Sequence, residues 1–493
     1  MMSQKEATEK QGLRKEKKAV DLTEGAILPK LIRFCIPLML VGMLQLLYNL
    51  ADTFVVGQFD TPDAVGAVTS CGSLIGLLVN LFIGLSVGVS VTVAQAVGAK
   101  QDREVSAIIH TSLTMGAIIG VIVGVLGFVF AEDALRLMKA PAGILPKAAP
   151  YMQAYMVGIP AAIIYNYCAA ALRAKGDSTR PMIFLAVSGV INVIMNLVMV
   201  IVFRMGALGV GIATTISQYV AMLMVLAYMT FFVKDSCRIC WNQLQIDGGK
   251  MKKILAVGLP AGFQSVLFSF SNVLIQSAVN TFGNAVVNGN GAAASIDGFI
   301  YNAMNSVYHG AITFVGQHVG ARKYDRLNRV MLDCMGLVTV IGLAVGAVVV
   351  LFSGPFLNVL IPGDEAAIAW GQERLVIIGW TYFLCGLMEV GSGSLRGMGR
   401  PIMPMLISLA GSCLLRIVWI YTIFQWEHTM FCLYLSYPVS WFVTAVVELA
   451  LAFAVKGKLI RQERERNEEA AVPVIAGDPV PLAETDGRDN CEG

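Results

Sequence analysis

Long runs of apolar residues, separated by short polar segments, dominate the chain between residues 31 and 455. The runs are apolar on every side, which is typical of helices surrounded by lipid. Each has at least the ~20 residues that cross a hydrocarbon core about 30 Å thick. They cover residues 31–57, 64–97, 104–130, 148–172, 181–203, 207–233, 253–281, 289–320, 327–353, 370–396, 401–424 and 430–455. The pattern predicts an all-α integral membrane protein with twelve transmembrane helices.

The polar segments divide these spans into two groups of six. We expect a cytoplasmic polar tail at residues 1–22, an N-terminal six-helix lobe at 23–233, a cytoplasmic linker at 234–252, a C-terminal six-helix lobe at 253–455 and a cytoplasmic disordered tail at 456–493. The last segment begins basic, turns acidic and contains proline, a composition typical of disorder.

The two halves of the chain repeat each other. Four short features of the first half recur in the same order in the second. They are Pro37 and Pro260, Asn49 and Asn272, AQAVGAK (94–100) and GQHVGAR (316–322), and ALRAKGDSTRP (171–181) and SLRGMGRP (394–401). Because each half has an even number of spans, both halves have the same orientation. Such a parallel repeat is the plan of some secondary transporters, whose substrate path lies between the halves.

The basic residues favour one side of this arrangement. With the N-terminus inside, 30 of the 36 lysines and arginines lie in the inner segments and only four in the outer loops. The remaining two, Arg374 and Arg416, fall within spans. Cytoplasmic loops carry an excess of Lys and Arg, so we expect both termini in the cytoplasm.

Composition agrees with a membrane protein and excludes several functions. The chain is 56% hydrophobic and 14% charged, whereas a soluble domain carries about 25% charged residues. The mean hydropathy is +0.69. The net charge of +3 indicates no nucleic-acid partner. The sequence has no GxxxxGK[ST] phosphate-binding loop and only four scattered histidines, so we expect neither an enzyme nor a bound cofactor.

At these residues the sequence resembles the multidrug and toxic compound extrusion (MATE) family. The stretch from Pro37 to Gly57 is similar to the first helix of that family. The two QxVGA[KR] loops and the two LR…G…RP loops resemble its paired cytoplasmic loops, and GALGVGIAT (206–214) resembles the start of its sixth helix. The resemblance covers residues 22–455. It implies a V-shaped, two-lobed bundle and cation-coupled export of organic compounds, with a coupling ion that varies within the family.

Asp52 is the strongest candidate for ion coupling. Gln45, Asn49 and Asp52 share one face of the first helix, which indicates that this face lines a cavity. Acids within a membrane span are costly and are functional candidates by default. The carboxyl group either binds H⁺ near neutral pH or, with amide oxygens, holds Na⁺. The alternative is an acid at the outer water boundary, because the loop from Gly57 follows. In many members of the family a first-helix Asp couples transport to the ion.

Asn192 and Asn196 lie four residues apart on the fifth helix, hence on one face. They resemble polar positions near the first-helix Asp in the family, where they would supply carbonyl oxygens or a proton relay. Hydrogen bonds between packed helices are the alternative. Some members also carry an acid in the sixth helix, but residues 205–233 contain none.

A second polar face lies on the seventh helix, at the positions that correspond to the first. It consists of Ser265, Ser269, Asn272 and Gln276. The repeat aligns Asp52 with Ile275, so only one half retains an acid. We expect both faces to line the cavity, with ion coupling in the N-terminal half. Packing between helices is again the alternative.

Two further charges lie within spans of the C-terminal half. Glu389 in the tenth span either binds a cation or forms a structural bridge with Arg416 or Arg396. Arg416 aligns with Asn196 and is either a counter-ion in the cavity or the partner of Glu389. We take Gln45, Asn49, Asn272, Gln276, Glu389 and Arg416 as the residues that line the substrate cavity.

The sequence thus predicts a monomeric antiporter in the cytoplasmic membrane, coupled to H⁺ or Na⁺. It would export organic, cationic or amphipathic compounds (multidrug efflux) by alternating access, with small organic substrates and lipid as its partners. The alternative is a flippase for a lipid-linked glycan or a related precursor. Such flippases usually have a more basic cavity, whereas Arg416 is nearly the only basic residue that we expect at depth.

Overall fold

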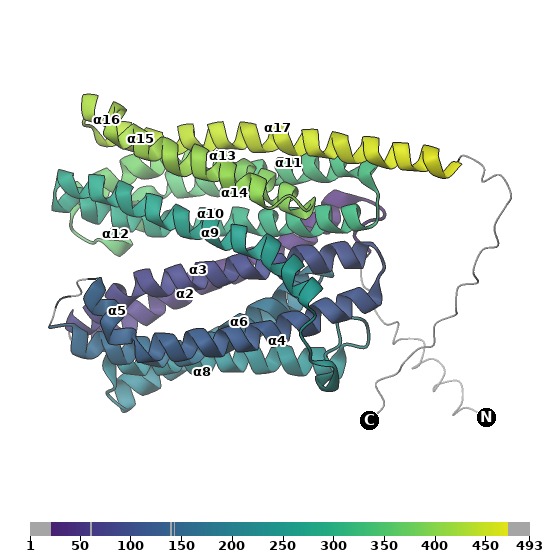
Figure 1. Cartoon of the computed structure of the whole chain (residues 1–493). Helices are drawn as coiled ribbons and strands as arrows, with labels where there is room; N and C mark the ends of the chain where they lie inside the picture. The colour runs from purple at the N-terminus through teal and green to yellow at the C-terminus, as the bar shows by residue number, and fades with distance from the viewer. Residues whose placement is uncertain (1–20, 60–61, 139–140, 142, 472–493) are drawn as a thin grey trace, which may run out of the picture.

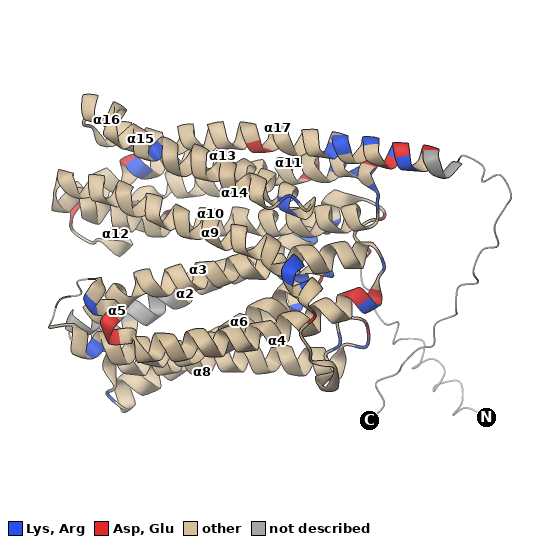
Figure 2. Ribbon diagram, viewed as in Figure 1, with Lys and Arg blue, Asp and Glu red and all other residues tan. Residues whose placement is uncertain are grey.

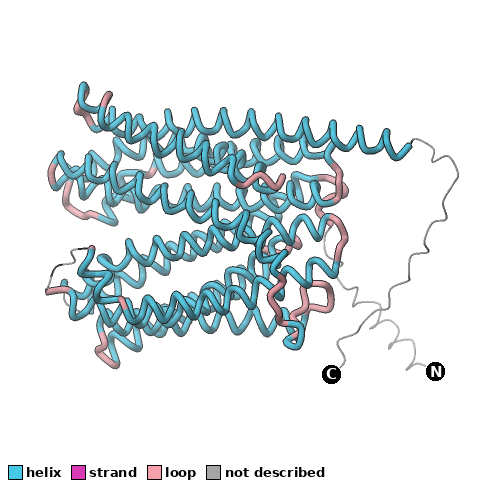
Figure 3. Tube along the Cα trace, in the orientation of Figure 1, coloured by secondary structure: helices cyan, strands magenta, loops and turns pink. Residues whose placement is uncertain are grey.

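The structure is a computed structural model that describes residues 21–59, 62–138, 141 and 143–471, with their side chains except those of residues 49–54, 56, 59, 62–65 and 469–471. In these ranges the chain is helical and contains no strand (Figure 3). Eleven of the described helices are long and apolar enough to cross a membrane. The twelfth long helix is α10 (Asn284–Gly320), which is more polar and corresponds to the predicted eighth span.

The N-terminal lobe contains six long helices. They are α2 (Ile27–Phe59), α3 (Pro62–Gly98), α4 (Asp102–Val129), α6 (Leu145–Ala174), α7 (Thr179–Leu197) and α8 (Gly206–Ala227). A π-helical turn extends each of the last two, at Val198–Val202 and Tyr228–Phe232, and the short helix α5 (Ala131–Leu137) follows α4. Helix α6 packs against α3, α4 and α8 and so lies at the centre of the lobe.

The C-terminal lobe repeats this arrangement. Its long helices are α9 (Gly248–Val279), α10, α11 (Leu327–Leu351), α13 (Glu365–Gly397), α14 (Ile402–Ser408) continued by a π-helical turn (Leu409–Leu414) and α15 (Leu415–Tyr421), and α17 (Met430–Ala471). The short helices α12 (Ser353–Leu360) and α16 (Ile423–Trp426) connect them. Helix α13 packs against α10, α11 and α17, as α6 does against its three neighbours. The predicted parallel repeat is therefore confirmed.

Each lobe has its own apolar core, and the lobes meet at one end of the bundle (Figure 1). The first turns of α2 pack on α10 of the other lobe, where the rings of Phe34 and Phe314 lie 5.9 Å apart. In the reciprocal contact α9 packs on α3, and a Cβ added to Gly88 would lie 2.2 Å from the carbonyl oxygen of Ile254. At the other end the ribbons of the two lobes lie apart, which gives the V shape (Figure 1).

The described ends of the chain lie at the same end of the bundle. Lys323 Nζ, after α10, donates to Thr23 Oγ1 at 3.0 Å, and Lys456 Nζ on α17 donates to Asn328 Oδ1 at 3.1 Å. Most lysines and arginines also gather there (Figure 2). We call this the basic end. The even number of spans and the separation of charge follow the sequence prediction.

Two boundaries differ from the prediction. Helix α17 continues to Ala471, whereas the sequence predicts disorder from residue 456. The segment after Gly457 consists of Lys, Arg, Glu, Gln and other good helix formers, which extend the helix beyond the apolar part. Helix α9 begins at Gly248, inside the predicted linker, because Asp247 caps it by accepting from Gly249 N and Lys250 N.

Candidate functional site

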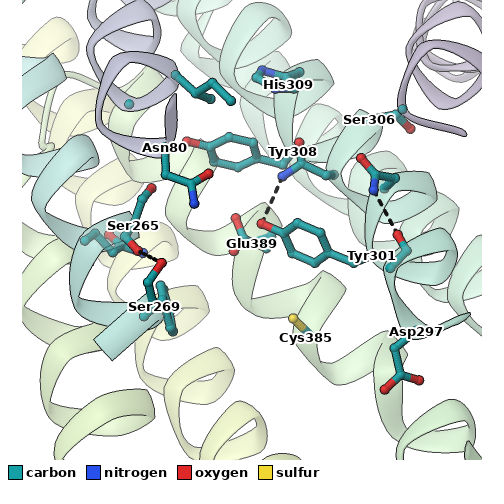
Figure 4. Close-up of a pocket in the computed structure, with 18 of the residues that line it drawn as sticks. Asn80, Ser265, Ser269, Asp297, Tyr301, Ser306, Tyr308, His309, Cys385 and Glu389 are labelled. Atoms are coloured by element: carbon teal, nitrogen blue, oxygen red, sulfur yellow. Dashed lines mark hydrogen bonds between the residues drawn. The ribbon is translucent and has the colours of Figure 1, made fainter. Parts of the chain in front are cut away.

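A cavity of about 660 Å³ lies between the two lobes. Its walls are formed by α2, α3, α6 and α7 of the N-terminal lobe and by α9, α10, α13, α15 and α17 of the C-terminal lobe. Most of its polar and charged wall residues belong to the C-terminal lobe, and Figure 4 shows several of them from α9, α10 and α13. A polar cavity between two repeats is where a parallel-repeat transporter binds its substrate.

On α2, Gln45 lines the cavity. The side chains of Asn49 and Asp52 lie outside the described part of the structure, which includes only their helical backbone. The backbone nevertheless indicates their neighbourhood. Tyr48 Oη donates to the carbonyl oxygen of Ala186 on α7 at 3.1 Å, and α2 also contacts the π-helical turn at the end of α7.

Helices α2 and α7 therefore run side by side in the same direction. A Cβ added to Gly189 would overlap the ring of Tyr48, at 1.8 Å. The next turn of α2 carries Asp52, and the next turn of α7 carries Asn192. The two turns lie side by side, and the role of Asp52 in ion coupling stays a prediction.

Asn192 and Asn196 are not part of the cavity wall. Both are buried, at 5% and 0% exposure. Asn192 Nδ2 donates to Thr214 Oγ1 on α8 at 3.4 Å, and Asn196 Nδ2 donates to Asn192 Oδ1 at 3.3 Å. They form a polar layer inside the N-terminal lobe, and their role in ion coupling stays a prediction.

The polar face of α9 lines the cavity along its length, with Ser265, Ser269, Asn272 and Gln276 all in the wall. Gln276 also joins α9 to α10, since its Oε1 accepts from Asn290 Nδ2 at 3.0 Å, while its Nε2 donates at 3.0 Å to Asn280 Oδ1 in the turn that follows α9. The face thus serves the cavity and the packing of α9 on α10 together.

A buried ion pair connects α10 and α13 near the end of the cavity opposite the basic end. Arg374 donates to Asp297 Oδ2 from Nη2 at 2.9 Å and from Nε at 3.0 Å. Arg374 Nη1 also donates to Asn290 Oδ1 at 2.7 Å. Neither charge is exposed to bulk water, so the pair fixes α10 against α13.

A second polar network runs from the cavity into the C-terminal lobe. Arg396 donates to Tyr308 Oη and, at 2.7 Å, to Gln264 Oε1. Gln264 Nε2 donates to Ser408 Oγ at 3.0 Å, and Ser408 Oγ donates to Glu448 Oε1 at 2.8 Å. Five helices therefore meet in one chain of hydrogen bonds that ends on a fully buried acid.

Glu389 points into the cavity from α13, toward Tyr301 of α10 (Figure 4). Among the described residues no basic side chain lies within 4.0 Å of its carboxylate. The predicted bridge to Arg416 or Arg396 is therefore not formed. Arg396 is held by Tyr308 and Gln264 instead, so Glu389 remains available to the cavity.

Arg416 lines the cavity from α15 and is 2% exposed. Its Nε donates to Ser440 Oγ at 2.8 Å, and its guanidinium carbon lies 4.4 Å from the ring centroid of Tyr437. Its Nη2 is buried and makes no hydrogen bond within the part of the chain that the structure describes.

The sequence prediction that Arg416 is nearly the only basic residue at depth is wrong. Arg173, Arg374 and Arg396 line the same cavity. Arg173 and Arg396 stand at the ends of α6 and α13, and from the sequence such a position is interpreted as part of a loop. The cavity reaches these two helix ends because the contacts that close it between the lobes lie beyond them.

The prediction also missed two acids, Asp297 and Glu448. Both stand within apolar spans, so each was visible as an acid in a predicted helix. On α10 the polar residues Asn290, Asp297, Tyr301 and Asn305 follow a helical spacing and all line the cavity. Within the described ranges, no cluster of three or more His, Cys, Asp or Glu side chains is placed to hold a metal ion.

The basic end of the cavity is closed by two glutamines that cross between the lobes. Gln95 Nε2 on α3 donates to the carbonyl oxygen of Gly397 at 2.9 Å, and Gln317 Nε2 on α10 donates to that of Ala174 at 2.7 Å. Each glutamine belongs to a QxVGA motif and each carbonyl to the end of an LR helix in the other lobe. We call these two reciprocal contacts the glutamine clamp.

The backbones beside the clamp are in contact as well. A Cβ added to Gly98 would lie 2.0 Å from the carbonyl oxygen of Gln317, and one added to Gly320 would lie 1.9 Å from that of Gln95. Lys100 and Arg322 both follow with a positive φ, of 56° and 55°, so the two loops have the same shape. Only glycine permits this approach at the two positions.

Comparison with known proteins gives one family and a set of similar transporters. A family model described as MatE matches residues 37–198 and again residues 260–422, so it matches each half of the chain once. The chain is 28% identical over 386 residues to probable multidrug resistance protein YoeA of Bacillus subtilis, covering 76% of this chain and 82% of that protein. It is 27% identical over 400 residues to probable multidrug resistance protein YpnP of the same organism, covering 81% and 89%.

A solved structure shares the fold. It is described as the outward-facing conformation of a multidrug resistance MATE family transporter of the MOP superfamily. The two superpose with a TM-score of 0.84 at 22% sequence identity, over 91% of this chain and 100% of that one.

Proposed function

Because the chain belongs to the MatE family, we propose that it is a secondary transporter that exports amphipathic organic compounds in exchange for H⁺ or Na⁺. The observation that carries the proposal is the polar cavity between two repeats, which are clamped together at one end and spread at the other. Two relatives are named probable multidrug resistance proteins, which supports organic cargo.

The energy source would be an ion gradient that acts on the N-terminal lobe. Asp52 is the acid on the first helix, and the backbone of its turn runs beside the turn of Asn192. Neutralisation of a carboxylate by H⁺ or Na⁺ changes the cost of burying it, so ion binding and helix packing are linked. The amides of Asn192 and Asn196 would respond to that change from inside the lobe.

Alternating access would require the glutamine clamp to open. Gln95 and Gln317 each make a single hydrogen bond to a backbone carbonyl of the other lobe. Each such hydrogen bond contributes only about 0.5–1.5 kcal/mol to stability, so the closed end is stabilised but is still able to open. Opening the clamp while the opposite ends approach would move the cavity from one side of the membrane to the other.

The orientation follows from the positive-inside rule. The basic end would face the cytoplasm, with both termini there, in the cytoplasmic membrane of a cell. In this orientation the clamp closes the cytoplasmic side, and the spread end faces outward.

A flippase for a lipid-linked precursor is the second candidate, favoured by the four arginines in the cavity wall. It differs from an exporter in its cargo, since it would move a lipid head group while the lipid tail stays in the membrane. An exporter would release soluble compounds into the external medium.

Proteoliposomes loaded with a soluble substrate test the proposal under an imposed pH or Na⁺ gradient, each applied separately. We expect one gradient to drive efflux at least about tenfold faster than passive leak. Asp52→Asn should remove this acceleration, because an amide has no negative charge for H⁺ or Na⁺ to neutralise. Asp133→Asn on the exposed surface of α5 is the matched control. Full gradient-driven efflux in the Asp52→Asn variant would exclude Asp52 as the coupling group.

A further inference from the structure

Among the side chains that the structure describes, the charges of the cavity wall do not balance. Among the described residues it contains four arginines and two acids, which leaves two formal positive charges. They are Arg173, Arg374, Arg396 and Arg416, with Asp297 and Glu389. Electrostatic complementarity favours ligands of the opposite sign, so this wall is poorly suited to organic cations.

One arginine is neutralised directly. Arg374 and Asp297 form the buried pair at 2.9 Å, with side-chain exposures of 9% and 5%. This pair contributes no net charge to the cavity. Three arginines and Glu389 remain.

Arg396 is compensated at a distance. Its hydrogen bond to Gln264 continues through Ser408 to Glu448, an acid that is fully buried behind the wall. Connected polar groups of this kind polarise one another, so the negative charge of Glu448 favours the positive charge of Arg396 at the other end of the network. Arg396 thus has a counter-charge within the protein.

Arg416 has no acid in its network. Its Nε donates to Ser440 Oγ, and Ser440 Oγ in turn donates to the carbonyl oxygen of Tyr437 at 2.8 Å. Its Nη2 is buried without a partner among the described residues, and the residue as a whole is only 2% exposed. A buried cation without a paired anion costs free energy. An anionic ligand at this site would supply the negative charge that Arg416 lacks.

Aromatic rings surround the same guanidinium. Its carbon lies 4.4 Å from the ring centroid of Tyr437 and 5.7 Å from that of Trp441. The ring of Tyr382 lies 5.0 Å from that of Trp441. All three rings line the cavity, and their faces stabilise the cation and hold its plane in one orientation.

We propose that Arg416 binds the anionic group of an aromatic organic anion, a sulfonate or a carboxylate, whose ring packs against Tyr382, Tyr437 and Trp441. The inference deepens the proposed export function, on which it rests, by naming the chemical class of the cargo. It replaces the expectation of cationic cargo. Nη2 supplies an unpartnered donor and the rings supply apolar contact. After the two compensated arginines, Arg173 and Arg416 remain against Glu389, and this excess of one positive charge among the described groups supplies the attraction.

Binding to the purified full-length chain in nanodiscs of neutral lipid tests the inference with three probes that share one ring system. They are naphthalenesulfonate, its neutral sulfonamide and naphthylmethylammonium. We expect wild type to bind the sulfonate at least about tenfold more tightly than the other two, as one charge-assisted hydrogen bond requires. Tighter binding of the ammonium would overturn the proposal without any variant.

Substitution of Arg416 locates the site. Arg416→Gln should lower the affinity for the sulfonate about tenfold to a hundredfold. Its affinity for the neutral sulfonamide should equal that of wild type, which would show that the cavity of the variant is folded. Arg416→Lys should retain part of the preference, because it keeps the charge and loses the planar donor set. Arg329→Gln, on the exposed surface of α11, is the matched control. An intact sulfonate preference in folded Arg416→Gln would contradict the proposal.

Transport measurements separate this inference from the proposed function. If the sulfonate preference depends on Arg416 but no gradient drives efflux, the anion site stands and the export function fails. If a gradient drives efflux of the ammonium but not of the sulfonate, the export function stands and the anion site fails.

Discussion

Arg173 and Arg396 end the equivalent helices α6 and α13, and seven residues before each stands a cavity residue that differs between the lobes. In the N-terminal lobe it is Asn166, whose Nδ2 donates to the carbonyl oxygen of Ala162 in its own helix. In the C-terminal lobe it is Glu389, which makes no ion pair among the described residues. Both lobes thus have an arginine at the end of this helix, but one presents a neutral amide and the other a carboxylate to the cavity.

A second pair of positions shows the same divergence. Asn192 and Ser412 correspond in the repeat, and each bonds to a threonine of the neighbouring helix: Asn192 to Thr214 on α8, and Ser412 to Thr444 on α17. One turn later Asn196 corresponds to Arg416. This contact between helices is common to both lobes, whereas the charge of Arg416 is not.

The comparison therefore separates two kinds of residue. The residues of the glutamine clamp, which joins the lobes, occur in both halves and should have equal effects there. Asp52, Glu389 and Arg416 each occur in one half only and should have unequal effects. We expect ion coupling in the N-terminal lobe and cargo recognition in the C-terminal lobe.

The largest expected effect concerns the backbone contact beside the clamp. Gly98→Ala and Gly320→Ala each place a methyl group within about 2 Å of a carbonyl oxygen of the other lobe, so either should abolish gradient-driven efflux in proteoliposomes. Gly72→Ala on α3 and Gly291→Ala on α10 are matched controls, because an added Cβ there meets no atom within 4 Å. If one of the two substitutions abolished gradient-driven efflux and the other left it unchanged, the two backbone contacts would not be functionally equivalent.

A smaller effect should distinguish the lobes in stability. Asp297→Asn leaves Arg374 buried without its anion, and we expect the free energy of unfolding to fall by about 3–5 kcal/mol in denaturant titrations. Combining it with Arg374→Gln should recover part of this loss, because the uncompensated charge disappears. Asp133→Asn, exposed on α5, should have no measurable effect. If the single variant is as stable as wild type, the pair does not hold α10 against α13.

The smallest effect concerns the clamp itself. Gln95→Ala and Gln317→Ala each remove one neutral hydrogen bond, worth about 0.5–1.5 kcal/mol, so hydrogen exchange at the loops after α3 and α10 should rise to a similar degree in both variants. Gln153→Ala removes a comparable exposed bond to Phe128 inside one lobe and serves as the control. Faster exchange in only one of the two variants would show that the clamp is not reciprocal.

The fold followed closely from the sequence. The apolar runs predicted all twelve long helices, including α10, whose polar residues reduce its hydropathy, because length and the repeat supported it. The repeat also predicted which helices correspond. The boundary of α17 was wrong because a charged segment of good helix formers prolongs it.

The site was predicted less completely. Helical spacing placed Gln45, Asn272 and Gln276 on cavity faces, since it depends on one helix at a time. Side-chain partners depend on the rotation and offset of two helices, which spacing does not contain. Arg374 and Asp297 are 77 residues apart, and Arg396 reaches Glu448 only through Gln264 and Ser408.

The division of labour between the lobes is tested most directly by measuring sulfonate binding and gradient-driven efflux together in Asp52→Asn and Arg416→Gln. We predict that Asp52→Asn binds the sulfonate like wild type and shows no driven efflux. Arg416→Gln should bind it about tenfold to a hundredfold more weakly, yet a gradient should still drive efflux of what is bound at saturating concentration. Loss of both activities in both folded variants would contradict a separation of coupling from recognition.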